Sequence, residues 1–357
     1  MLDKFKIGKK NVGKNCPTYF IADIAANHDG DLSKAIDLIY LSAEAGADAV
    51  KFQHFKAENI VSDYGFKNLN TKSSHQSNWK KSVFDTYKDA SLPREWTEEL
   101  QKISNKAGVH FFSAPYDFEA VNLLDDLNVP AHKVGSGDIT WIEIIRRMCK
   151  RKIPIFLATG ASNIEDVKRA MNIIETEQVP VCLMQCNTNY TGENENFEHI
   201  NLNVLKQYAQ IWPDAILGLS DHTSGHATVL GAVALGARAI EKHFTNDKSQ
   251  EGPDHGFSMD PKDWKEMVDR TRELELALGE DEKNICENEI ETVVLQRRCW
   301  RLKKNLSIGT KIEENHLEVL RPSPLDSIKP YEIRKVLGKK INKDMLKGQH
   351  ISIKDFE

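Results

Sequence analysis

The sequence lacks any apolar run that approaches the length of about 18 residues expected of a membrane-spanning helix, so no membrane segment is predicted. The N-terminal stretch MLDKFKIGKKNVGKN is charged and no apolar core follows it, and we therefore expect no signal peptide. Blocks of about five or more basic residues are also missing, and the formal net charge at pH 7 is −5. Neither a nucleic acid nor a membrane surface is therefore an expected partner.

Cysteine is scarce, and the cysteines occur without the CxxC spacing of a zinc or redox motif. They are Cys16, Cys149, Cys182, Cys186, Cys286 and Cys299. In a chain of 357 residues, this scatter is typical of free thiols in a reducing compartment rather than of a disulfide framework. We therefore expect a cytoplasmic protein without a cysteine-based zinc site.

What the sequence does contain is a series of short apolar runs separated by helical patterns. The runs cover residues 18–25, 49–55, 110–115, 131–136, 153–160, 181–186, 216–221 and 239–245. Alternation of strands and helices favours parallel pairing, because parallel strands need a long crossover connection. Eight such units over about 250 residues predict an α/β fold, a closed (β/α)8 TIM barrel, with its active site at the C-terminal ends of the strands.

The regular alternation ends near residue 282, so we expect the barrel domain to comprise residues 1–282. Residues 283–298 are expected to form a polar connecting helix. Residues 299–357 have a different sequence pattern, in which short β-like segments alternate with turns. This pattern predicts a small C-terminal domain.

Two local features of the barrel region stand out. Ser162 and Glu165 predict a capping box at the start of a helix. The connection from Lys56 to Asp89 is long, polar and rich in Asn, Ser and Lys. Connections of this length are typically functional, and this one is expected to cover the barrel mouth.

Two histidines, His222 and His243, end the seventh and eighth predicted strands. Neighbouring strands would place them side by side at the barrel mouth, where neutral imidazoles suit Mn²⁺, Zn²⁺, Fe²⁺ or Co²⁺. Two protein ligands leave coordination positions for substrate or water. The alternative is a pair of hydrogen-bonded structural histidines. His226 and His255 are expected to be surface or supporting residues.

Lys51 and Lys133 lie on the second and fourth predicted strands. Two lysines that point into one mouth create a focused positive field for an anion. Gly135-Ser136-Gly137, Thr159-Gly160 and Ser220 add close backbone approach and hydroxyl donors. The set indicates a site for a phosphate or phospho-carboxylate, unless the lysines merely extend along a solvated face.

Acidic and amide residues also follow the strands. Asp23 and Glu241 are candidates for proton transfer or for positioning a hydroxyl group. Residues 187–191, which include Thr188 and Tyr190, offer neutral donors that suit a sugar or an anion as well as an ordinary turn. Asp254 either reaches the mouth or stabilises its own turn.

Together, the motifs NHDGDL, VKFQ, HKVGSGD, LATG, GLSDHT, EKHFT and GPDHGFSMDP resemble those of the sialic acid synthase family. The segments EVLRP and VLGKKINKDMLKGQHI resemble the C-terminal SAF (antifreeze-like) domain of that family, and the resemblance covers about residues 17–357. It implies a TIM barrel followed by an SAF domain, assembled as a domain-swapped homodimer. It also implies condensation of phosphoenolpyruvate with an N-acyl mannosamine-type sugar, giving a nine-carbon 2-keto acid and phosphate.

The resemblance further implies roles for individual residues. His222 and His243 match the two metal ligands, and Mn²⁺ is the expected ion, with Mg²⁺ or Co²⁺ as alternatives. The residues that match phosphoenolpyruvate-binding positions are Lys51, Lys133, Ser136 and Ser220. The residues that match the sugar site are Gln53, Tyr190, Glu241, Asp254 and Arg321, the last in the SAF domain and expected to reach the partner subunit's site.

The sequence departs from the family pattern at several positions. Asp23 stands where Glu is usual, which shortens its reach by one methylene group. Ala114 and Ala158 replace a Thr and a Ser that contact phosphoenolpyruvate in some members. Thr188, also expected to bind substrate, stands where an Asn can occur. The anion pocket is therefore related to that of the family but not identical to it.

Several functions remain open at this stage. The acceptor could be N-acetylmannosamine, its 6-phosphate, or a diacetamido-trideoxyhexose that leads to legionaminic or pseudaminic acid. Another metal-dependent synthase of 3-deoxy sugar acids would share the barrel but not the SAF-like tail. A non-enzymatic carbohydrate- or ice-binding protein is disfavoured, because residues 299–357 contain a single Thr, Thr310, and many charges.

Overall fold

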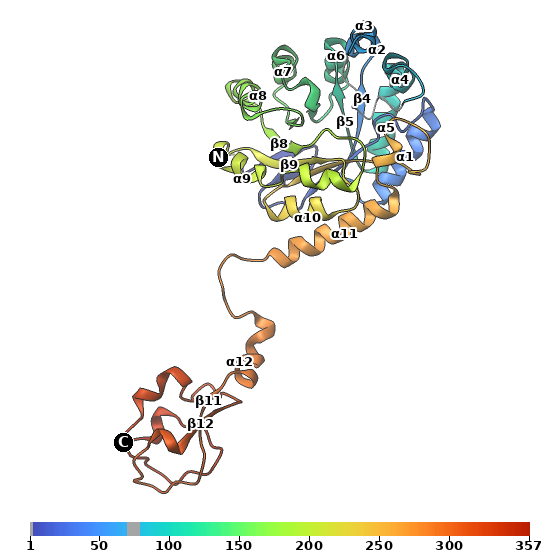
Figure 1. Ribbon diagram of the computed structural model, residues 1–357. Helices are drawn as coiled ribbons and strands as arrows, with labels where there is room; N and C mark the ends of the chain where they lie inside the picture. Colours follow the sequence, from blue (N-terminus) through green and yellow to red (C-terminus); the bar gives the residue numbers. More distant parts are fainter. Residues whose placement is uncertain (1–2, 70–78) are drawn as a thin grey trace. The chain divides into compact units, whose positions relative to one another are not determined.

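The computed structural model describes residues 3–69 and 79–357. The chain forms two compact units, Met1–Gly279 and Glu280–Glu357, and each is described by itself (Figure 1). No helix in these described ranges is long and apolar enough to cross a membrane.

The first unit is a closed parallel barrel, which confirms the fold predicted from the apolar runs. Its strands are β3 (Tyr19–Asp23), β4 (Ala49–His54), β5 (His110–Pro115), β6 (His132–Val134), β7 (Ile155–Ala158), β8 (Val181–Cys186), β9 (Ile216–Asp221) and β10 (Ala239–His243). They pair in sequence order, and β10 closes the barrel against β3. Each strand therefore delivers its last residues to one common mouth.

Helices surround the barrel, one after most strands (Figure 1). They are α1 (Leu32–Glu44), α5 (Thr97–Ala107), α6 (Phe118–Asp126), α7 (Ile142–Cys149), α8 (Ile164–Thr176), α9 (Val204–Ile211), α10 (Ala227–Ala234) and α11 (Pro261–Leu278). The connection from Lys56 to Asp89 contains the short helices α2 (Ala57–Ile60) and α3 (Asp63–Lys67) and most of α4 (Val83–Ala90). Part of this expected cover, residues 70–78, lies outside the described residues.

The start of α8 differs from the prediction by one residue. Asn163, not Ser162, is the N-cap, and its side chain accepts hydrogen bonds from the backbone amides of Glu165 and Asp166. Asp166 completes the capping box by accepting from the backbone amide of Asn163. Ser162 instead donates to the carbonyl of Thr159, because the chain is still leaving β7 at that point.

An antiparallel hairpin that the sequence pattern did not predict precedes the barrel. It comprises β1 (Lys4–Ile7) and β2 (Lys10–Gly13). Phe5 is buried and packs edge-on against Phe156 of β7, with ring centroids 6.0 Å apart. The hairpin thus adds apolar side chains to the barrel core at the end opposite the mouth.

The second unit has its own small core. After the short helix α12 (Ile290–Gln296), the strands β11 (Cys299–Leu302) and β12 (Leu317–Leu320) form an antiparallel pair. The buried apolar residues that pack together here are Leu302, Leu306, Ile312, Leu317, Ile328, Val336, Ile341, Met345 and Ile351. The helix expected over residues 283–298 is shorter, because a 3₁₀ turn at Glu287–Glu289 precedes it.

Candidate active site at the barrel mouth

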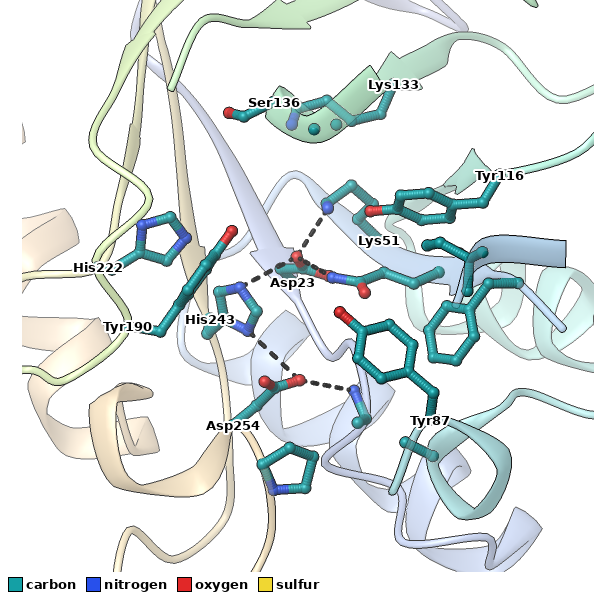
Figure 2. Close-up of a pocket in the computed structure, with 18 of the residues that line it drawn as sticks. Asp23, Lys51, Tyr87, Tyr116, Lys133, Ser136, Tyr190, His222, His243 and Asp254 are labelled. Carbon is teal, nitrogen blue, oxygen red and sulfur yellow. Dashed lines mark hydrogen bonds and ion pairs between the residues drawn. The ribbon is translucent and has the colours of Figure 1, made fainter. Parts of the chain in front are cut away.

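A cavity of about 390 Å³ lies at the C-terminal ends of the strands. Figure 2 shows the side chains that converge on it from many elements of the barrel. Sequence reasoning had selected several of its lining residues: Asp23, Lys51, Gln53, Lys133, Ser136, Tyr190, Ser220, His222, Glu241, His243 and Asp254. The structure therefore brings together most of the predicted site residues, from seven different segments of the chain.

The floor of the cavity holds a buried cluster of alternating charges. Lys51 Nζ lies 2.7 Å from Asp23 Oδ2 and 3.4 Å from Glu241 Oε1. Lys133 Nζ lies 3.1 Å from the same Glu241 oxygen. Strand register explains the arrangement, because Asp23 pairs with Lys51 and Glu241 pairs with Ser220 on neighbouring strands. Two ammonium groups and two carboxylates compensate one another where isolated charges would be costly.

The two carboxyl groups of this cluster differ in their acidity. Burial raises the pKa of Asp23, and the nearby lysines only partly offset that effect. Burial also opposes ionisation of Glu241, but Lys133 and Lys51 lower its pKa to about 2. Burial lowers the pKa of Lys51, yet Asp23 and Glu241 outweigh it and hold that pKa above its ordinary value. Asp23 is thus the group of the cluster that most readily gains a proton.

The two predicted histidines lie side by side. His222 directly follows β9, His243 ends β10, and their ring centroids are 5.3 Å apart. His222 Nδ1 donates to the carbonyl of Asn187 at 2.8 Å. In this tautomer the Nε2 atom is unprotonated and carries a lone pair. His243 Nδ1 is buried, has no hydrogen-bond partner among the described residues, and lies 4.0 Å from Asp254 Oδ2.

Both imidazoles are neutral at physiological pH. Burial lowers the pKa of His222 to about 3, and the proximity of His243 adds to the effect. Burial, followed by the charge of Lys51, lowers the pKa of His243 to about 3. Neutral imidazoles with available ring nitrogens have the chemistry of metal ligands. In the described part of the chain, however, no three His, Cys, Asp or Glu side chains are grouped as a metal site.

Aromatic packing holds the histidines in place. The ring of Tyr190 lies 4.4 Å from that of His222, and the ring of Phe257 lies 4.8 Å from that of His243. Asp221, which precedes His222 in the sequence, does not line the cavity. It is buried against Lys242, which donates to its Oδ2 at 2.5 Å. Strand alternation turns Asp221 and Lys242 away from the barrel interior.

The predicted anion-binding segments meet between β6 and β7. Ser136 Oγ accepts from the backbone amide of Gly160 at 3.0 Å. A Cβ on Gly160 would lie 2.4 Å from Thr188 Cγ2 and 2.9 Å from Ser136 Oγ, so this position requires glycine. Thr159 is not available as an anion donor, because its hydroxyl donates to the carbonyl of Met184 and accepts from Tyr208.

Some of the residues predicted to bind the sugar line the cavity, and others do not. Gln53 donates to Asp23 Oδ2 at 3.2 Å, and Asp254 accepts from the backbone amide of Ala26 at 3.1 Å. Burial raises the pKa of Asp254 to about 7. Thr188 is not among the lining residues. Arg321 belongs to the second unit, where it directly follows β12.

One acidic residue and several apolar residues that line the cavity were not predicted from the sequence. Asp138 lines the cavity, and burial raises its pKa to about 6. The motif GSGD contains it, and that motif was the available signal. The missed apolar and aromatic lining residues are Phe55, Ile60, Trp79, Tyr87, Ala90 and Tyr116. No periodic pattern marked them, because they come from the residues just after β4 and β5, from the short helices α2 and α4, and from the residue stretch before α4.

One of the two histidines expected to be surface or supporting residues is buried next to the site. His255 is fully buried, with Nδ1 2.7 Å from the Thr245 hydroxyl and Nε2 3.2 Å from Asp29. Asn27 donates to the carbonyl of Phe244 and to Ser258. These bonds tie the segment after β3 to the segment after β10, and the latter segment carries Asp254.

A parallel eight-stranded barrel with buried lysines, carboxylates and neutral imidazoles at its C-terminal mouth defines a barrel enzyme site suited to an anionic substrate. The chain matches the NeuB family over residues 38–283 and the SAF domain over residues 297–357. It belongs to the NeuB family, and its curated relatives include sialic, legionaminic and pseudaminic acid synthases. The family resemblance and the enzyme class expected from the sequence are thereby confirmed.

Three relatives illustrate the range of named activities. The chain is 32% identical to the N,N'-diacetyllegionaminic acid synthase of Legionella pneumophila, over 96% of this chain and 95% of that protein. It is 31% identical to the human N-acetylneuraminate-9-phosphate synthase, over 92% and 90% of the two chains. It is 30% identical to the pseudaminic acid synthase of Helicobacter pylori, over 96% and 98%.

The comparison with solved structures agrees with the family found from the sequence. The crystal structure of the N-acetylneuraminic acid synthetase from Leptospira borgpetersenii superposes with a TM-score of 0.71 at 27% identity. The match covers 81% of this chain and 95% of that chain.

Proposed function

We propose that the protein is a nonulosonic acid synthase that condenses phosphoenolpyruvate with an open-chain N-acyl hexosamine. The products are a nine-carbon 2-keto sugar acid and inorganic phosphate. One observation carries the proposal: a single cavity places Lys51 and Lys133 beside the neutral pair His222 and His243. This combination suits a phospho-carboxylate and an aldehyde held next to each other.

The anion-binding part of the cavity suits phosphoenolpyruvate. Lys51 and Lys133 are buried ammonium groups, and their positive field acts on an anion with little screening by solvent. Ser136 and Ser220 add hydroxyl groups on the same side of the barrel. Their role is to orient the methylene carbon of phosphoenolpyruvate toward the aldehyde and to stabilise developing charge.

The paired imidazoles fit a divalent metal ion. Asn187 fixes the tautomer of His222, and the buried Nδ1 of His243 has no protein hydrogen-bond partner in the described residues. We propose that these histidines hold Mn²⁺, with Mg²⁺ or Co²⁺ as alternatives. When bound, such an ion supplies Lewis-acid polarisation of the aldehyde oxygen.

The reaction balances as follows. The methylene carbon of phosphoenolpyruvate forms a bond to the aldehyde carbon, and the aldehyde oxygen gains a proton. Water adds to the central carbon of phosphoenolpyruvate and loses a proton, which gives a tetrahedral intermediate. The carbon–oxygen bond to the phosphate then breaks, and the remaining hydroxyl loses its proton to become the ketone.

Asp23 and Glu241 are the proposed proton carriers. Asp23 has a raised pKa and contacts both Lys51 and Gln53, so it can donate and recover a proton at the acceptor oxygen. Glu241 keeps its charge between the two lysines. Its Oε2 is buried without a partner among the described residues, so it can accept a hydrogen bond from water or from a sugar hydroxyl.

We also propose a cytoplasmic, domain-swapped homodimer in which Arg321 of one subunit holds the sugar in the cavity of its partner. The support is the SAF domain, which follows the barrel in the order shared with the synthases. The alternative acceptors are diacetamido-trideoxyhexoses, since both legionaminic and pseudaminic acid synthases are among the relatives. A different 3-deoxy sugar acid synthase is disfavoured because the SAF domain matches.

The test is phosphate release from phosphoenolpyruvate with a panel of acceptors, followed by mass spectrometry of the products. The panel contains N-acetylmannosamine, its 6-phosphate, diacetamido-trideoxyhexoses, and pentose and tetrose phosphates. We expect phosphate release with an N-acyl hexosamine and a nine-carbon keto acid as product. Release only with the pentose or tetrose phosphates would overturn the proposal.

A further inference from the structure

Tyr116 lines the cavity, and the proposed reaction gives it no role. It directly follows β5, the strand that lies between β4, which carries Lys51, and β6, which carries Lys133. The strand that precedes His222, β9, stands opposite β5 in the closed order of the barrel. Figure 2 shows Tyr116 on the far side of Lys51 from His222 and His243. Tyr116 therefore belongs to the part of the mouth that the two lysines enter.

The phenol ring of Tyr116 is held in place by its neighbours. The backbone amide of Tyr116 donates to the carbonyl of His54 at 3.0 Å, which ties the residue to the end of β4. The ring of Phe55 packs edge-on against the phenol ring, with centroids 6.0 Å apart. A Cβ on Gly135 would lie 2.9 Å from the phenol oxygen, closer than side chains approach, so this oxygen lies against the backbone that leads into Ser136. A group held in this way loses little conformational freedom when it binds a ligand.

The Tyr116 hydroxyl is available as a hydrogen-bond donor. No hydrogen bond joins it to another residue in the described part of the chain. Ser220 differs, because its hydroxyl donates to Glu241 Oε1 at 3.1 Å. Burial, followed by the charge of Asp138, raises the pKa of Tyr116 well above its ordinary value. The phenol therefore keeps its proton at neutral pH and can donate it in a hydrogen bond to an anion.

The two lysines by themselves leave part of a phospho-carboxylate without hydrogen bonds. Each ammonium group has three N–H donors, and some of these donors already face carboxylates. Lys51 lies next to Asp23 and Glu241, and Lys133 lies next to Glu241. A carboxylate and a phosphate together present more oxygen atoms than the remaining N–H groups can reach. A buried anionic oxygen without a donor is costly, so a neutral donor between the lysines strengthens binding.

We infer that the Tyr116 hydroxyl donates a hydrogen bond to phosphoenolpyruvate between Lys51 and Lys133, and that it sets the affinity for this substrate rather than for the sugar. The inference rests on the proposed synthase function and adds a binding residue to its anion site. A hydrogen bond to a charged group of this kind changes binding by about tenfold to 100-fold. Because the phenol is neutral, it strengthens binding without altering the charge balance among the lysines, Asp23 and Glu241.

The experiment compares the unmodified protein with Tyr116→Phe, which removes the hydroxyl group and keeps the ring. Isothermal titration calorimetry with phosphoenolpyruvate and Mn²⁺, without an acceptor, measures binding in the absence of turnover. We expect the Kd for phosphoenolpyruvate to rise by about tenfold or more. In steady-state assays its KM should rise in parallel, whereas the acceptor KM should stay unchanged. Tyr40→Phe is the matched control, because Tyr40 lies on α1 and is not among the described lining residues.

The possible outcomes separate the inference from the proposed function. An unchanged Kd in folded Tyr116→Phe would overturn the inference while the synthase function stands. A rise in the acceptor KM as large as the rise for phosphoenolpyruvate would also overturn it, because it would place the phenol at the sugar. An unmodified protein that neither binds phosphoenolpyruvate nor releases phosphate from it would overturn both.

A second variant tests the same contact from the other side. Gly135→Ala places a methyl group against the phenol oxygen and should displace the hydroxyl. We expect Gly135→Ala to weaken phosphoenolpyruvate binding by about tenfold in the unmodified protein and by much less in the Tyr116→Phe background, where the hydrogen bond is already lost. Equal losses in the two backgrounds would overturn the inference.

Discussion

At the scale of single residues, the carboxyl groups of Asp23 and Glu241 differ in acidity because their charged partners differ. Glu241 lies between two ammonium groups and keeps its charge, whereas Asp23 shares one lysine and is more easily protonated. Environment rather than residue type thus gives the two acids different acidities.

The first prediction concerns the histidine pair. His222→Ala and His243→Ala should each lower turnover by more than about 100-fold, because loss of a direct metal ligand exceeds the 10–100-fold cost of altering a supporting residue. Each variant should also bind less Mn²⁺ per protein, measured by elemental analysis after dialysis. His226→Ala is the control, since His226 follows β9 but does not line the cavity. Full metal content and turnover in His222→Ala would refute the ligand assignment.

At the scale of elements, the structure moves a helix cap by one position, and this shift is measurable. Asn163→Ala removes the acceptor of two backbone amides at the start of α8 and should lower the free energy of unfolding by about 1 kcal/mol. Ser162→Ala removes only a hydroxyl group that donates to the carbonyl of Thr159, and it should cost less than about half as much. Urea unfolding monitored by tryptophan fluorescence compares the two. A larger loss in Ser162→Ala would support the cap predicted from the sequence instead.

A second prediction at this scale concerns acid stability. Asp125 of α6 accepts from His132 of β6 at 2.9 Å and from Arg147 of α7 at 2.7 Å. Burial alone would raise the pKa of Asp125, but these hydrogen bonds hold it below its ordinary value. A lowered folded-state pKa means that the stabilisation is complete above the unfolded pKa of about 4 and is lost as the pH falls through the folded value.

Asp125→Asn should therefore lower the free energy of unfolding by about 2 kcal/mol at pH 7. The difference from the unmodified protein should shrink below about pH 4, and urea titrations at pH 7 and at low pH measure it. Asp126→Asn is the matched control, because Asp126 is exposed on the same helix. A difference that does not change with pH would contradict the role of the ionised carboxylate.

The eight barrel strands were predictable because each is a short buried run bounded by polar residues, as in the fully buried stretch Ile216–Asp221. The hairpin at Lys4–Gly13 was not, because its few apolar residues gain burial only when they dock on the barrel. In the site, Lys51, His222 and His243 were predictable from strand positions. The lining residues Ile60, Tyr87 and Ala90 were not predictable. They lie on α2 and α4, and helices this short have no hydrophobic periodicity that indicates which way they run.

At the scale of the whole molecule, the barrel and the SAF domain have separate cores. The barrel unit contains the complete charged cluster, and Arg321 belongs to the other unit. If Arg321 holds the sugar, Arg321→Ala should raise the KM for the acceptor by about tenfold or more and leave the KM for phosphoenolpyruvate unchanged. Light scattering should report a dimer for both proteins. An unchanged acceptor KM would remove Arg321 from the sugar site.

The proposed exchange of arginines between subunits has a sharper consequence. A heterodimer purified through two different tags can combine one His222→Ala subunit with one Arg321→Ala subunit. If Arg321 acts across the dimer, one cavity receives both an intact histidine pair and an intact arginine from its partner, and the other receives neither. At low acceptor concentration such a heterodimer should show about half of the normal activity, although each parent homodimer is nearly inactive. If Arg321 serves its own barrel, no cavity is complete, and the activity should stay at or below the level of the Arg321→Ala homodimer. The same measurement therefore separates a swapped domain from one that folds back on its own chain.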